Sequence, residues 1–167
     1  MLVVVMVAVV VLWAALGKLR GGIANFGREL SEVVGLSPRL AAATAVAVVV
    51  GELGWAALLF ADPVPGAAFS IGALGVLACV NAVFLRKGRR ECLCFGATVR
   101  SSPRTALLRN TFLMLLAVPV LIAGPVVLAS PVVDISLGVV LSLALIRIED
   151  LVKAVRFVVG SPTEAAS

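Results

Sequence analysis

Long apolar runs are the feature that most constrains the fold of this chain. Residues 2–16 read LVVVMVAVVVLWAAL, and similar runs occupy residues 40–61, 66–85 and 106–123. A helix rises about 1.5 Å per residue, so roughly 20 apolar residues cross the hydrocarbon core of a bilayer. Inside lipid the backbone must satisfy its own hydrogen bonds, which a helix does within one segment. The sequence therefore predicts an all-α integral membrane protein with a four-helix transmembrane bundle.

Composition agrees with this interpretation and leaves no room for a soluble domain. Of the 167 residues, 62% are hydrophobic and 14% are charged, whereas soluble domains are nearer half apolar and about a quarter charged. The first run is short, and Gly17, Lys18 and Leu19 extend it, with Lys18 expected as an anchor whose ammonium group reaches the interface. No Lys or Arg precedes Lys18, which favours a retained span over a signal peptide.

The C-terminal third adds a fifth predicted span and a different kind of helix. Residues 132–146 are apolar but short, and we expect them to span the membrane. Residues 147–159 place apolar side chains at helical spacing between charges, which predicts an amphipathic helix at the membrane surface. The expected organisation is a membrane core over residues 1–123, the fifth span and amphipathic helix over 124–159, and a disordered tail over 160–167.

The basic residues are sharply segregated. Of the 14 Lys and Arg, 13 fall between the first and second runs, between the third and fourth runs, or in the tail, and Arg109 lies at the start of the fourth run. The two other connections carry no Lys or Arg, and only the acids Asp62 and Asp134 stand at that side. Five spans place the three basic segments on one side, which the positive-inside rule makes cytoplasmic, with the N-terminus outside. The net charge of +5 is therefore assigned to membrane topology rather than to nucleic-acid binding, because no basic stripe with interleaved aromatic residues is present.

Two cysteines stand in the most basic of these segments, RRECLCFGATVR at residues 89–100. Neighbouring positive charge lowers the pKa of a thiol and favours the reactive thiolate, so Cys92 and Cys94 are candidates for thiol–disulfide exchange. A disulfide between them would close a small, strained ring, and strained disulfides are the more oxidising ones. A Cu(I) or zinc thiolate site and an incidental pair of loop residues are the alternatives. The chain has no His, which excludes Ser-His-Asp and Cys-His nucleophilic sites.

A carboxylate lies near the middle of the second run, in AVAVVVGELGWAALLF. Glu52 is costly to insert at that depth, by roughly 2.5–3.5 kcal/mol, and such a residue marks a functional site by default. We expect it to face the bundle interior, with Gly51 and Gly54 allowing close helix approach on its flanks. The alternative is a structural partnership with one of three polar residues: Asn81, Thr44 or Lys18.

Three other residues in the apolar runs are expected to have structural roles. Cys79 is expected to be a small buried apolar side chain. Trp55 is expected to pack or to lie in an interfacial belt. Asn110 is expected to cap the fourth span or to hydrogen-bond a neighbouring helix.

Several of these features together resemble the MauE family of methylamine-utilisation membrane proteins, which are related in fold to DoxX-like four-helix bundles. The features are LGKLRGGIANF after the first run, the acid inside the second, CLCFG after the third and LLRN opening the fourth. The resemblance covers roughly residues 1–123. It matches Cys92 and Cys94 to the cysteine pair of the family and Glu52 to its intramembrane acid.

The resemblance implies a membrane component of thiol–disulfide chemistry that works beside a thioredoxin-like partner. Family members are associated with maturation of the disulfide-rich small subunit of methylamine dehydrogenase, and DoxX-like relatives are linked to quinones. A quinone is therefore a candidate electron acceptor. The family substrate is extracytoplasmic, whereas the charge distribution places Cys92 and Cys94 inside, and we keep the topology given by the charges.

The leading hypothesis is a membrane thiol–disulfide oxidoreductase component that uses Cys92, Cys94 and Glu52. A second hypothesis is a non-catalytic membrane subunit that binds or stabilises a partner protein. A third is a protein that handles metal ions through thiolates.

Overall fold

The computed structural model describes residues 1–86, 102–125, 130–148 and 150, and all regular structure in these ranges is helical. Cys92, Cys94, most of the predicted amphipathic segment and residues 160–167 lie outside the described residues. The helices are α1 (Leu2–Gly21), α2 (Ile23–Val34), α3 (Pro38–Ala61), α4 (Pro63–Arg86), α5 (Pro103–Ala123) and α6 (Pro131–Ile146).

The predicted all-helical membrane fold is confirmed. Helices α1, α3, α4 and α5 are long and apolar enough to cross a bilayer, and α6 is a shorter apolar helix. The 16 residues of α6 rise about 24 Å, somewhat less than the hydrocarbon core, so α6 fits as a short fifth span. Helices α3, α5 and α6 begin at prolines, slightly earlier than the apolar runs, because proline suits the first helical position.

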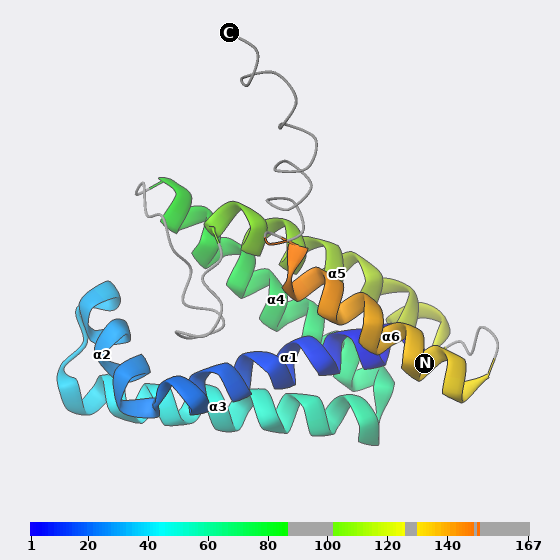
Figure 1. Cartoon of the computed structure of the whole chain (residues 1–167), viewed down its shortest axis with the longest axis horizontal. Coiled ribbons are helices and arrows are strands. Elements are labelled where there is room, and N and C mark those ends of the chain that lie inside the picture. The colour runs from blue at the N-terminus through cyan, green and yellow to red at the C-terminus, as the bar shows by residue number, and fades with distance from the viewer. Residues whose placement is uncertain (87–101, 126–129, 149, 151–167) are drawn as a thin grey trace, which may run out of the picture.

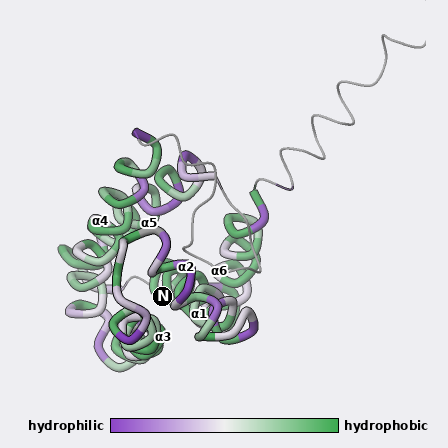
Figure 2. The backbone as a smooth tube through the Cα atoms, turned by 90° about the vertical axis from the view of Figure 1, so that its left-hand side faces the viewer, coloured by the Kyte–Doolittle hydropathy of each residue, from purple (hydrophilic) through white to green (hydrophobic). Residues whose placement is uncertain are grey.

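Helix α1 is the centre of the bundle. Most of α1 is buried, whereas the other three long spans expose most of their surface. It packs against α3 on one side and α6 on another, while α4 and α5 form a closely packed antiparallel pair (Figure 1). The end-on view in Figure 2 shows α3, the α4–α5 pair and α6 arranged around α1, with mostly hydrophobic colours along the helices.

Helix α2 was not predicted from the sequence. It lies across the end of the bundle where α1 ends and α3 begins, and packs on α3 (Figure 1). Its apolar residues Ile23, Phe26, Leu30 and Val34 recur at helical spacing, so a signal was present in the loop. Glycines with positive φ flank the helix, Gly22 at 85° and a left-handed Gly35 at 75°.

The charged residues separate along the bundle as the sequence suggests. The described Lys and Arg residues belong to α2 or to the parts of the other helices nearer one extremity of the bundle, where α1 and α4 end and α3 and α5 begin (Figure 1). Helix α6 runs toward the same extremity but ends before reaching it (Figure 1). Asp62 and Asp134 belong to the opposite extremity. We call the first extremity the basic end. Arg86 and Pro103, the residues nearest the segment that carries the cysteines, both lie there.

Close helix contacts occur at glycines other than those predicted. A Cβ added at Gly51 or Gly54 would meet nothing within 4 Å, so the predicted close approach there is wrong. At Gly66 an added Cβ would lie 2.8 Å from the Leu59 Cα, and at Gly138 it would lie 3.0 Å from the Val5 side chain. These contacts join α4 to α3 and α6 to α1, because small residues let helices approach in lipid.

A hydroxyl group also fixes α6 against α1. Ser142 is buried, and its Oγ donates to the Met6 carbonyl oxygen at 3.2 Å and to the Gly138 carbonyl oxygen at 2.6 Å. The short helix α6 is therefore part of the bundle. By contrast Cys79 is exposed on α4, so its predicted burial is wrong; it lies on the outer face of a bundle whose surface is apolar.

The contact at Gly66 gives a stability prediction. Gly66→Ala should destabilise the protein by about 1–3 kcal/mol, because the new methyl group meets backbone atoms of α3 that have little freedom to move. Unfolding in mixed detergent micelles, followed by circular dichroism, measures the change. The matched control is Gly72→Ala on the same helix, where an added Cβ meets nothing within 4 Å and higher helix propensity should stabilise slightly. Equal effects of the two variants would contradict the close packing of α3 and α4.

Candidate functional site

The intramembrane acid is paired with a lysine from the neighbouring helix. Lys18 Nζ lies 2.6 Å from Glu52 Oε1, and it also donates to the Ala14 carbonyl oxygen at 3.4 Å. The ammonium group sits 5.4 Å from the centroid of the Phe26 ring, within the range of a cation–π interaction. Of the three structural partners considered for Glu52, the structure selects Lys18.

The other two partners bond elsewhere. Thr44 Oγ1 donates to the Leu40 carbonyl oxygen, and Asn81 Nδ2 donates to the Leu77 carbonyl oxygen at 2.8 Å. Both bonds stay within their own helices, so neither residue meets the carboxylate through them.

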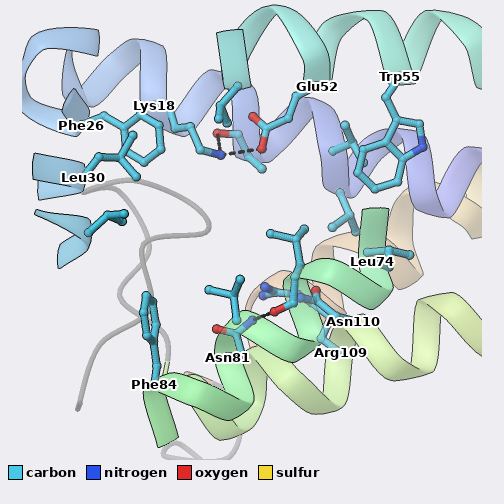
Figure 3. A pocket seen from close by; sticks show the side chains of 17 residues that line it. Lys18, Phe26, Leu30, Glu52, Trp55, Leu74, Asn81, Phe84, Arg109 and Asn110 are labelled. Atoms are coloured by element: carbon cyan, nitrogen blue, oxygen red, sulfur yellow. Dashed lines mark hydrogen bonds and ion pairs between the residues drawn. The ribbon is translucent and has the colours of Figure 1, made fainter. Parts of the chain in front are cut away.

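Burial makes the pair more than a surface ion pair. The side chain of Lys18 is 3% exposed and that of Glu52 is 16% exposed, so the prediction that Lys18 is an interfacial anchor is wrong. Its stem turns into the bundle because the Glu52 carboxylate on the antiparallel helix α3 lies at the same height (Figure 3). A buried charge needs a partner to compensate its lost hydration, and each residue supplies the other's.

The ion pair borders a cavity of about 290 Å³. The cavity lies between the α1–α3 pair and the α4–α5 pair, and α2 contributes three apolar side chains to it (Figure 3). Most of the wall is aliphatic or aromatic. Its lining residues are Val10, Val11, Ala14, Lys18, Phe26, Leu30, Val34, Val48, Glu52, Trp55, Leu74, Leu77, Val80, Asn81, Phe84, Arg109 and Asn110.

Three polar residues face Glu52 from the other side of the cavity. Asn81 comes from α4, and the buried residues Arg109 and Asn110 come from α5 (Figure 3). Asn110 is not the cap of α5, because Ser102 Oγ accepts the Thr105 N–H at 3.2 Å and takes that role. Asn110 lies two turns further along the helix, facing the cavity. The motif LLRN therefore delivers two polar side chains to the interior. From the sequence, only Asn110 was expected to have a role, and that role was structural.

Arg109 takes part in another interaction, but its Nε makes no hydrogen bond among the described residues. Two further polar atoms at this cavity also lack hydrogen-bond partners there: Glu52 Oε2 and Asn110 Nδ2. One is an acceptor and the other is a donor. Such atoms are costly inside an apolar bundle, and each marks a place where a partner atom can bind.

Trp55 has both a structural bond and a place in the cavity wall. Its Nε1 donates to Ser70 Oγ at 2.8 Å, and its ring meets Phe69 edge-on with centroids 5.7 Å apart. The ring is thus held firmly between α3 and α4, as the packing interpretation predicts. It also borders the cavity, which makes it an intrinsic fluorescent reporter of the site.

The described part of the chain brings together Glu52, Lys18, Asn81, Arg109 and Asn110. It includes no cluster of three or more His, Cys, Asp or Glu residues that could hold a metal ion. Cys92 and Cys94 fall outside it, so their roles remain predictions from the sequence.

The buried pair predicts strong coupling between Lys18 and Glu52. Lys18→Met or Glu52→Gln alone should destabilise the protein by roughly 3 kcal/mol, because each leaves a buried charge without its partner. The double variant should lose much less than the sum of the two single variants. Arg20→Met, at an exposed position on the same helix, is the control and should change stability little. A Lys18→Met effect as small as that of Arg20→Met would contradict a buried pair.

Comparison with known proteins adds the family to this geometry. No curated protein and no solved structure matches the chain. The family model described as methylamine utilisation protein MauE matches residues 1–123, which include the first four long spans, α2, the Lys18–Glu52 pair and the cavity wall. Since the match covers most of the sequence and the helices are those of a membrane bundle, the chain belongs to the MauE family of multi-pass membrane proteins.

Proposed function

We propose that this protein is the membrane component of a thiol–disulfide exchange system, with Cys92 and Cys94 as the exchanging pair. The observation that carries the proposal is the buried Lys18–Glu52 pair, which borders a cavity at the end of the bundle from which the cysteine segment extends. A paired intramembrane acid beside a cavity is the arrangement expected of a site that handles protons.

Covalent distances support a connection between the cysteines and the cavity. Cys92 follows Arg86 by six residues, so its Cα lies within about 20 Å of the end of α4 even in a fully extended chain. Phe84, two residues before Arg86, borders the cavity. On the other flank, Pro103 begins the helix that contributes Arg109 and Asn110 to the same wall.

The exchange itself needs two thiols and a partner disulfide. A thiolate of one cysteine attacks a partner sulfur, forms a mixed disulfide and releases the partner's first thiolate. The second cysteine then attacks its neighbour's sulfur, releases the partner's second thiolate and closes the Cys92–Cys94 disulfide. Two electrons pass to the partner, which is reduced, and the same steps in reverse oxidise it. A thioredoxin-like protein is the proposed partner.

A lipid-soluble quinone is the proposed second redox partner. When a quinone takes two electrons from the reduced cysteine pair it also takes two protons and becomes a quinol. Glu52 is proposed to accept or release one of these protons at the cavity, and Lys18 is proposed to position the carboxylate. The cysteine pair is proposed to exchange electrons with the protein partner and with the quinone in separate steps.

The proposed topology places the N-terminus outside and the basic end in the cytoplasm. The gathering of described Lys and Arg residues at one extremity, with Asp62 and Asp134 at the other, supports it through the positive-inside rule. Because Arg86 and Pro103 belong to the basic end, the cysteine segment starts and finishes on the side proposed to be cytoplasmic.

Substitution of single cysteines tests the exchange chemistry. Cys92→Ser and Cys94→Ser should each abolish exchange, and the variant that keeps the attacking cysteine should leave a mixed disulfide with the partner, because its resolving thiol is gone. Non-reducing electrophoresis of cells grown with each variant detects the adduct. Cys79→Ser removes the exposed cysteine of α4 and should leave exchange intact. Full exchange by both variants would exclude the redox function and favour a non-catalytic subunit that stabilises a partner.

Labelling of the cysteines tests the topology. In a Cys79→Ser background, a membrane-impermeant maleimide should label Cys92 and Cys94 only after the cells are permeabilised. A cysteine introduced by Asp62→Cys, in a chain without the native cysteines, reports on the opposite extremity and should be labelled on intact cells. Strong labelling of Cys92 and Cys94 from outside would reverse the proposed orientation.

A further inference from the structure

We propose that the cavity is a binding site for an uncharged amphiphile whose head group carries a hydrogen-bond acceptor or a hydroxyl donor, with Asn110 and Glu52 as the recognising residues. The inference deepens the proposed function and rests on it for any electron-carrying role of the ligand. The binding itself is argued from the cavity alone.

The charges of the cavity favour a neutral ligand. Lys18 and Glu52 compensate each other at 2.6 Å, and Arg109 already interacts with another group. An ionic ligand would lose its hydration in a largely apolar space, which is costly. A neutral head group loses far less on entry.

The two unpartnered atoms specify what the head group must offer. Asn110 Nδ2 is a donor and Glu52 Oε2 is an acceptor, and neither has a partner among the described residues. Asn110 is 3% exposed, so bulk water reaches it poorly. The two side chains lie on opposite sides of the cavity, Glu52 on α3 and Asn110 on α5 (Figure 3). A carbonyl oxygen of the ligand can accept from Asn110, and a hydroxyl group can donate to Glu52.

The size and walls of the cavity specify the remainder of the ligand. An apolar cavity of about 150 Å³ holds one benzene molecule, and this cavity measures about 290 Å³. It therefore has room for a ring-sized head group and the start of an aliphatic chain. Aromatic rings of Phe26, Trp55 and Phe84 and many aliphatic side chains form the wall, which suits a molecule that partitions into the bilayer.

Two membrane molecules share this chemistry: a quinone or quinol, and a neutral glyceride lipid. Decylbenzoquinone and glycerol monolaurate are suitable probes for the two sources. The chain has two Trp residues, so Trp13→Phe leaves Trp55 in the cavity wall as the only indole. Decylbenzoquinone should quench its fluorescence to saturation in purified full-length protein in lipid nanodiscs, and native mass spectrometry should detect bound glycerol monolaurate.

Matched variants locate the binding. Asn110→Leu keeps the branching of the side chain but replaces the amide with methyl groups and so removes the donor, and it should weaken binding of the preferred probe about tenfold, the effect of losing a hydrogen bond of about 1.4 kcal/mol. Asn25→Leu, at an exposed position on α2, should have no effect. If Asn110→Leu does not fold, Val48→Phe fills part of the cavity from α3 and should weaken binding at least as much. Its control is Val50→Phe, which points away from the bundle at 62% exposure.

Each outcome decides the proposal. Saturable binding of either probe that is weakened by Asn110→Leu or Val48→Phe, but not by the control variants, supports it and identifies the source. Failure of both probes to bind, or binding that ignores the cavity variants, overturns it and leaves water as the partner of the two polar atoms. Binding should persist in the Cys92→Ser/Cys94→Ser double variant, so the binding site and the thiol chemistry can fail separately.

Discussion

The ion pair between Lys18 and Glu52 is the interaction on which the interior of this bundle depends. A single buried charge at this depth would move toward water or would become neutral by gaining or losing a proton. A pair at 2.6 Å is neutral as a unit. The pairing also ties α1 to α3, because Lys18 and Glu52 belong to these two helices and lie 34 positions apart in the sequence.

The close contacts at Gly66 and Gly138 lie toward the extremity opposite the basic end, and the cavity lies toward the basic end. Gly66 brings α4 against the backbone of α3 near the start of α4, while Gly138 and Ser142 hold α6 on α1. Helices in lipid associate through such close contacts, since no hydrophobic driving force favours one apolar neighbour over another. Toward the basic end the α4–α5 pair diverges from the α1–α3 pair (Figure 1). Helix α2 covers that end with Phe26, Leu30 and Val34.

The sequence was sufficient for the spans because hydropathy and length are local properties. The boundaries differ by a few residues, mainly where a proline begins a helix earlier than the apolar run and where α1 continues to Gly21. Properties that depend on helix rotation were harder to predict. Glu52 was expected to face inward, but its partner depended on the register between α1 and α3. For the same reason the close helix approaches predicted at Gly51 and Gly54 occur instead at Gly66 and at Gly138. Helix α2 was missed because its short apolar repeat lies among the charges of a connecting segment.

The ligand proposed for the cavity has a consequence for the redox chemistry proposed for this protein. Reduction of a quinone by two electrons and two protons gives a quinol of the same net charge, so the bound molecule can change oxidation state without placing a new charge in the bundle. The hydrogen bonds change instead: a carbonyl oxygen that accepts from Asn110 becomes a hydroxyl group that can also donate, and Glu52 Oε2 is an acceptor without a described partner. Both forms would therefore find a partner in the same cavity, which lets a ligand enter in one form and leave in the other.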